Sequence, residues 1–295
     1  MAGENAALEA HLATGHTTVC NAWAIIRKDG VRFAFTDHDV DLEFEGQVFR
    51  ADTGLSANAI AQSTGLSVDN TEAIGALSDA AIREDEIEQG RFDGAEVRSW
   101  LVNWADPDQR WEQFRGSIGE LHRADGVFRA ELRGLTEALN RPLGRVFQKP
   151  CTAVFGDKNC GFDPDQPGFR LELPVISVEG ERSFSWPELE GYGKGWFTRG
   201  RLDVVDGAAA GLWAMIKHDR LAEGGRVIEL WEPVRGTVSA GDRVLLTAGC
   251  DKRSDTCRVK FDNLINFQGF PDLPGEDWVT SVPRSSGANS GGSLR

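Results

Sequence analysis

The chain of 295 residues has few cysteines and no long apolar run. Five cysteines are far too few for a disulfide scaffold, and clustered cysteines in a reducing compartment are more often metal ligands or catalytic residues. No apolar run reaches the length of a bilayer span, and the first residues lack the basic start and apolar block of a secretion signal. We therefore expect a chain that folds in the cytoplasm without stable membrane insertion.

Positive charge is also scarce. The chain has 32 Lys and Arg against 46 Asp and Glu, which gives a formal net charge of -14. A field of this sign repels phosphate backbones and anionic membrane surfaces. Specific nucleic-acid recognition is therefore not expected.

The length exceeds that of one ordinary core and predicts two domains. The alternation of apolar and polar residues predicts a mainly β protein, with two β-rich bodies that resemble barrels or sandwiches and a few short helices. We expect, in chain order, an N-terminal β-rich domain over 1–150, a first cysteine segment over 151–168, a second, inserted β domain over 169–248, a second cysteine segment over 249–276 and a flexible Ser/Gly tail over 277–295.

Individual elements are also predicted. In the first domain we expect hairpins within 18–39 and 40–51, the second turning at Glu45-Gly46, and three antiparallel strands within 95–104, 110–124 and 126–135. Strand-like residues lie at 67–77, and helices are expected within 4–13, 57–63, 79–90 and 135–147. In the second domain, strands are expected within 169–180, 195–205, 211–219, 225–233 and 242–249.

Two cysteine pairs bracket the second domain: Cys151 with Cys160, and Cys250 with Cys257. Four thiolates at one point need a cation to offset their repulsion, and both Zn²⁺ and an iron–sulfur cluster accept four cysteines. Eight and six residues separate the members of the pairs, which is wider than the roughly two to four of a zinc knuckle. The spacing favours the bulkier cluster, while zinc, local disulfides and buried reduced thiols remain alternatives.

Other candidate sites are weaker. Cys20 lies in an apolar alternation and is expected in a buried strand. Asp37, Asp39 and Asp41 alternate as in a calcium loop, but the glycine and glutamate that such a loop needs are missing, so a solvated turn is expected. The histidines (His11, His16, His38, His122 and His218) fall in no catalytic motif, and we expect no enzyme. Two rival hypotheses stay open: a zinc-stapled binding module, and a redox or hydrolytic enzyme that uses the cysteines or these acids.

The nine tryptophans fall mostly in predicted strands. Core and interface packing is the commoner role of such residues, ahead of ligand stacking. They therefore indicate large packed surfaces.

Several segments together resemble one family: "TDHDVDLEFEGQVFRADTG", "GLSVDN", "DGAEVRSWLVNWADPDQR", "RPLGRVFQKPC", "CGFD" and "AGCDKRSDTCRVKFDNLINFQGFPDLPG". Over about residues 17–278 the chain is similar to the baseplate hub proteins of gene transfer agents, which are related to siphophage tail-tip proteins such as lambda protein L. The resemblance implies a structural virion component in which Cys151, Cys160, Cys250 and Cys257 bind an iron–sulfur cluster, [4Fe–4S] in type.

The same resemblance implies partners. The chain would form a homotrimeric ring in the tail baseplate, between the distal tail protein on the tube side and a fibre-bearing central protein at the tip. DNA would pass through its channel without specific binding. The cluster would then be a structural staple, since no nucleotide fold, flavin motif or second redox site accompanies it.

Overall fold

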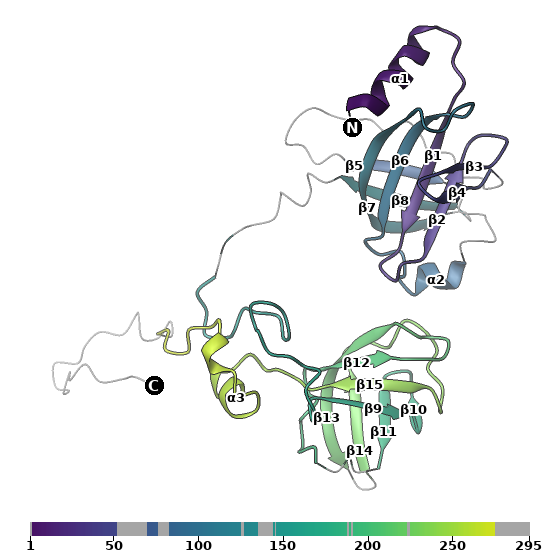
Figure 1. The fold of residues 1–295 in the computed structure, drawn as a ribbon. Coiled ribbons are helices and arrows are strands. Elements are labelled where there is room, and N and C mark those ends of the chain that lie inside the picture. The colour runs from purple at the N-terminus through teal and green to yellow at the C-terminus, as the bar shows by residue number, and fades with distance from the viewer. Residues whose placement is uncertain are drawn as a thin grey trace. The chain divides into compact units, whose positions relative to one another are not determined.

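The computed structural model describes residues 2–51, 70–75, 83–124, 127–134, 144, 146–187, 189, 191–222 and 225–274. The chain divides into two compact units, Met1–Leu143 and Gly144–Arg295 (Figure 1). The helices expected over 57–63 and, for the most part, over 135–147 lie outside the described residues, and so does the expected tail. Among the helices of the described residues, none is long and apolar enough to cross a membrane.

The first unit is built on an antiparallel six-stranded sheet of order β2-β1-β6-β7-β8-β5. Its strands are β1 (Val19–Ile26), β2 (Arg32–Thr36), β5 (Asn70–Gly75), β6 (Glu96–Asn103), β7 (Arg110–Ala124) and β8 (Val127–Gly134). A separate hairpin joins β3 (Leu42–Phe44) to β4 (Gln47–Phe49), and the helices are α1 (Ala2–Ala13) and α2 (Glu84–Glu88). Figure 1 shows the sheet curved into a half-barrel.

The alternation in β1 places its small residues in the core. Cys20 and Ala22 are buried and pair with Val102 and Trp100 of β6. The Trp100 ring makes T-shaped contacts with the stacked Phe44 and Phe49 rings, with centroids 5.6 Å away in both cases. The predicted buried position of Cys20 is confirmed.

The tight turn between β3 and β4 is also as predicted. Glu45 and Gly46 both have positive φ, 52° and 68°. Positive φ at both central residues is typical of the two-residue turns that suit the right-handed twist of a hairpin.

The second unit contains an antiparallel seven-stranded sheet of order β10-β11-β14-β13-β12-β15-β9. Its strands are β9 (Arg170–Pro174), β10 (Ser177–Glu179), β11 (Ser183–Trp186), β12 (Arg201–Val204), β13 (Trp213–Ala222), β14 (Gly225–Leu230) and β15 (Arg243–Thr247). Consecutive strands β9 and β10 lie at opposite ends of this order, so the sheet curls back on itself. The Trp186 indole N–H bridges this closure and donates to the Pro174 carbonyl at 2.8 Å.

The core of the second unit lies inside the curl. Inward-facing residues of all the longer strands are fully or almost fully buried, among them Phe184, Leu202, Ile216, Ile228, Leu230 and Leu246. The short elements α3 (Ser254–Val259) and η2 (Leu264–Asn266) follow β15. The predicted fold class, mainly β with two β-rich bodies and a few short helices, is confirmed.

Candidate cysteine site

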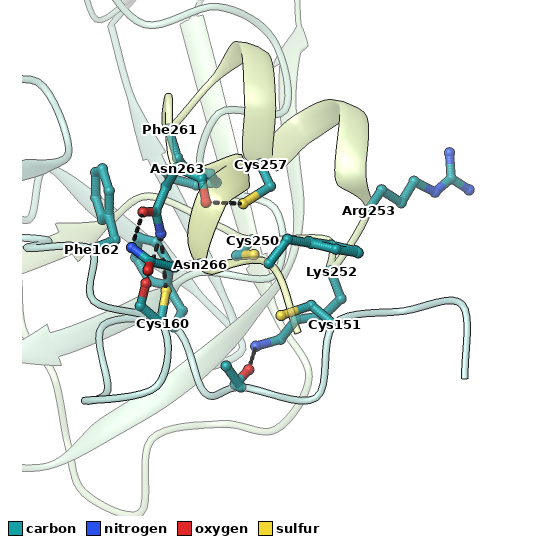
Figure 2. Close-up of a pocket in the computed structure, with 13 residues that line it drawn as sticks. Cys151, Cys160, Phe162, Cys250, Lys252, Arg253, Cys257, Phe261, Asn263 and Asn266 are labelled. Carbon is teal, nitrogen blue, oxygen red and sulfur yellow. Dashed lines mark hydrogen bonds between the residues drawn. The ribbon is translucent and has the colours of Figure 1, made fainter. Parts of the chain in front are cut away.

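Cys151, Cys160, Cys250 and Cys257 line one small cavity in the second unit (Figure 2). The first pair precedes β9, Cys250 follows β15, and Cys257 lies in α3. All four are free thiols, and the cavity has a volume of about 20 Å³. The two cysteine pairs predict one shared site, and the structure brings all four residues around the same cavity, without Cys20.

The four thiols surround this space and do not meet at a single point. Within the described ranges, no group of three or more His, Cys, Asp or Glu side chains is placed to hold a metal ion. All four cysteines nevertheless line the same cavity, and the charges of the other three act on Cys257. The donor set, four thiols and no carboxylate or imidazole, is of the kind that binds zinc or an iron–sulfur cluster.

Hydrogen bonds join the two cysteine segments directly. The Cys151 backbone N–H donates to the Lys252 carbonyl at 2.9 Å, and the Lys252 ammonium donates to the Ala153 carbonyl at 2.5 Å. The Gln268 backbone N–H donates to Cys151 Sγ at 3.4 Å. The segment that leads into the sheet therefore lies against the segment that leaves it.

Two side-chain hydrogen bonds of Asp251 shape the turn before α3. Asp251 accepts from the Arg253 backbone N–H at 3.0 Å and from the Thr256 hydroxyl at 2.8 Å. Lys252 takes a positive φ of 66°, which turns the chain sharply between Cys250 and the helix. As a result Cys250 and Cys257 face the same cavity.

A second local turn presents Cys160. Asp157 accepts from the backbone N–H groups of Cys160, at 2.6 Å, and of Val154, at 3.2 Å. These hydrogen bonds, the one from Cys160 first, lower the pKa of the Asp157 carboxyl. Gly161 follows with a positive φ of 65°, a conformation that glycine adopts without strain.

The thiols are close enough to influence one another. Burial raises the pKa of Cys250. The pKa of Cys257 is raised to about 11, first by burial and then by the negative charges of Cys250, Cys151 and Cys160 as thiolates. The protein alone therefore opposes ionisation of Cys250 and Cys257, and a bound cation would offset the repulsion between thiolates.

Lys260 is a half-buried cation that directly follows α3. Its ammonium donates to the carbonyls of Trp196, at 2.5 Å, and Gly249, at 2.8 Å, and lies 4.5 Å from the centroid of the Trp196 ring. Burial lowers the pKa of Lys260 to about 8. The residue ties the chain just before Cys250 to the loop that precedes β12.

An aromatic cluster connects the cysteines to the seven-stranded sheet. Phe162 packs against Phe261 and Phe169, with ring centroids 5.0 and 4.8 Å away, and Phe169 packs against Trp196 at 5.8 Å. Phe155, Cys160 and Cys250 belong to the same apolar cluster. Such an apolar wall limits the access of water to a metal group.

The acidic motif of the first unit forms a local turn, as predicted. Asp37 accepts from the backbone and side-chain amides of Asn21 at 2.7 and 2.8 Å. Asp41 accepts from the Ala51 backbone N–H at 2.9 Å. Both carboxylates are exposed, and their hydrogen bonds join the turn to Asn21 in β1 and to Ala51 beyond β4.

The tryptophans divide between core and surface. Trp100 and Trp186 are buried in the two sheets, as core packing predicts. Trp213 and Trp231 are 55% and 54% exposed, and Met215 next to them is 42% exposed. A group of large apolar side chains on an outer face is typical of a protein contact surface.

The comparisons with known proteins agree with this architecture. The model of the family described as "Baseplate hub protein, N-terminal attachment domain" matches residues 5–163, more than half of the chain. That of "Phage conserved hypothetical protein BR0599" matches residues 195–277. The chain therefore belongs to the baseplate hub protein family, and the resemblance seen in the sequence is confirmed.

A solved structure extends the likeness to the whole chain. A chain in the structure titled "Virion of native gene transfer agent (GTA) particle" is 52% identical, with a TM-score of 0.89, over 98% of this chain and 99% of that chain. A search of curated protein sequences gave no match. The family and the particle together identify a structural protein of a phage-like tail baseplate.

Proposed function

We propose that the chain forms a homotrimeric ring at the baseplate of a gene transfer agent. The ring links the tail tube and distal tail protein to the fibre-bearing central protein of the tip, and it surrounds the channel through which DNA passes. The four cysteines hold an iron–sulfur cluster that fixes the two ends of the second β body to each other. The chain itself catalyses no reaction in this role.

The observation that carries the assembly role is the near full-length likeness to a chain of a gene transfer agent particle. The match covers 98% of this chain and 99% of that chain, so the likeness extends over both units. The exposed Trp213, Met215 and Trp231 supply apolar surface that an assembly would bury. A closed ring satisfies a head-to-tail contact in every copy.

The cluster proposal is supported by the chemistry of the donors. Two of the thiols precede the seven-stranded sheet in the sequence and two follow it, and all four line one cavity with an apolar wall. Their wide spacing in each pair suits a cluster better than a zinc knuckle. When bound, the group would supply four metal–thiolate bonds that join these segments, so its binding energy would become folding energy there.

The channel proposal is supported by charge. With a net charge of -14, the chain lacks the excess of Lys and Arg that binds phosphates by releasing counterions. DNA would pass such a surface without being held.

Two measurements test the proposal. Mass analysis of intact particles should give three copies of the chain at a position of threefold symmetry, and a single copy would contradict the ring. The chain purified without oxygen should be brown, contain iron and sulfide, and lose visible absorbance on reduction. If the protein is colourless and contains stoichiometric zinc, the four cysteines form a zinc site and not a cluster site. The proposed assembly role would not be affected.

A further inference from the structure

Asn263 is a buried polar residue at the centre of the cysteine site. Its exposed fraction is 8%, and it lies between α3 and η2, six positions after Cys257. Figure 2 shows its side chain among the cavity-lining residues, directed at Cys160. A buried amide needs hydrogen-bond partners, so its contacts show what it is for.

Asn263 bonds to both cysteine pairs. Its backbone N–H donates to the Cys257 carbonyl at 3.0 Å, and its own carbonyl accepts from Cys257 Sγ at 3.3 Å. Its side-chain Nδ2 donates to the Cys160 carbonyl at 2.7 Å and lies 3.8 Å from Cys160 Sγ. One residue thus connects the cysteine before β9 with the cysteine after β15.

The neighbouring residues fix the orientation of this amide. Asn266 Nδ2 donates to Asn263 Oδ1 at 2.7 Å, so the oxygen is occupied on that side. The Cys160 carbonyl can only accept, and Nδ2 must therefore be the atom that faces it. Gly161 leaves room for Asn266, since a Cβ added at Gly161 would lie 3.0 Å from Asn266 Nδ2.

We propose that Asn263 is the positioning residue of the metal site, which holds Cys160 in place and donates a hydrogen bond to its sulfur. The inference rests on the cluster proposed above. A thiolate is a stronger acceptor than a thiol, so the donor aimed at Cys160 Sγ gains strength when that sulfur binds metal. Partners of metal ligands orient them, and hydrogen bonds to cluster sulfurs set the reduction potential.

Asn263→Asp is the sharpest test, because it keeps the size of the side chain and replaces both N–H donors by acceptors. We expect the variant, purified without oxygen, to bind iron about 10- to 100-fold more weakly in competition with a chelator. The cluster that remains should have a lower midpoint potential, because a donor to its sulfur is lost and a negative charge is added beside it. Asn266→Ala removes the hydrogen bond that orients the Asn263 amide but keeps the amide itself. It should lower the iron affinity and the midpoint potential less than Asn263→Asp does.

Asn103→Asp is the matched control. Asn103 is 4% exposed, lies in the first unit and hydrogen-bonds to Gln109 and Thr18. Its substitution should cost stability and leave iron affinity and potential unchanged. Should Asn263→Asp fail to fold, Asn266→Ala decides by the same two readouts.

The outcomes separate two failures. The role of Asn263 would be overturned if both Asn263→Asp and Asn266→Ala keep the wild-type iron affinity and midpoint potential. If Cys160→Ser loses iron in the same experiment, the cluster proposal still holds. A wild-type chain that contains no metal when purified without oxygen would overturn the cluster and, with it, this inference.

Discussion

The backbone N–H of Cys151 donates to the carbonyl of Lys252 at 2.9 Å, although the whole seven-stranded sheet lies between these residues in the sequence. Further bonds run alongside: the Phe270 backbone N–H donates to the Gln148 carbonyl at 2.9 Å, and the Thr152 hydroxyl to the Gln268 carbonyl at 3.3 Å. The protein therefore closes the loop around the second β body with hydrogen bonds as well as with the proposed metal group.

Removal of metal should loosen these two segments together. Residues 148–163 and 247–271 carry all four cysteines that line the cavity, so metal–thiolate bonds there would tie the two segments to each other. After chelation, limited proteolysis should cut both segments faster, while the inward-facing strands of the seven-stranded sheet stay protected. Faster cutting of only one segment would show that the pairs act separately.

Gly249→Ala should displace the backbone next to Cys250 and so weaken the cysteine site. A Cβ at Gly249 would lie 1.7 Å from the Thr198 carbonyl oxygen, so the backbone just before Cys250 must move. We expect a loss of about 1–3 kcal/mol of stability and a lower iron content, measured by denaturant unfolding and metal analysis.

Gly193→Ala is the matched control for Gly249→Ala. A Cβ at Gly193 would meet no atom within 4 Å. Equal effects of the two substitutions on iron content would show that the close contact at Gly249 is not what holds Cys250.

Asp219→Ala should strongly destabilise the second unit. Arg226 and Asp219 are both fully buried, with Arg226 Nε and Nη2 2.7 and 2.8 Å from the carboxylate oxygens of Asp219, which also accepts from the Phe197 backbone N–H at 2.9 Å. Loss of the carboxylate leaves a buried guanidinium without its counter-charge, which costs about 3–5 kcal/mol. Denaturant unfolding measures this loss.

The ion pair between the exposed Arg220 and the half-buried Glu229 provides the comparison. Its atoms are 3.1 Å apart and the Arg220 side chain is 59% exposed. Arg220→Ala should therefore change stability by about 1 kcal/mol or less. A similar cost at Asp219 would mean that water reaches the buried pair.

Much of the β structure could be predicted because one face of each strand is buried. The range 110–124 was predicted as a strand and is β7, and the alternation that placed Cys20 inward holds in β1. Strand β11, with the sequence "SFSW", was missed, because four residues between polar turns carry too little pattern. Its Phe184 and Trp186 are buried by partners that only the closed sheet supplies.

The cysteines could be recognised from the sequence, and the residues around them could not. Helix α3 is six residues long and has no apolar stripe, so periodicity gave no sign of it. The hydrogen-bond partners that define the surrounding residues lie far along the chain. Asn263 bonds to Cys160, about a hundred residues earlier, and Lys260 bonds to Trp196 in another loop. The sequence "NLIN" after the last cysteine was the available signal, since two amides within a short apolar stretch must find partners if they are buried.

The ring can be tested apart from the metal. Mixed with the protein of the tube side or of the tip, the chain should form a closed threefold complex, because closure leaves no head-to-tail surface exposed. Mass measurement and imaging of the complex would show this. A stoichiometry of one copy in the complex would contradict the ring even if iron is present.

The four cysteines should behave as one unit in stability. A double variant, Cys151→Ser with Cys257→Ser, should be scarcely less stable than either single variant, since the first substitution already removes the shared group. Additive losses in denaturant unfolding would indicate four independent packing residues.

The iron content of the four single serine variants tests the central claim most directly. In protein purified without oxygen, Cys151→Ser, Cys160→Ser, Cys250→Ser and Cys257→Ser should each abolish bound iron. Cys20→Ser, a change at a buried thiol in the other unit, should leave it at the wild-type level. Wild-type iron in any one of the four, or iron lost from Cys20→Ser, would contradict a cluster held by Cys151, Cys160, Cys250 and Cys257.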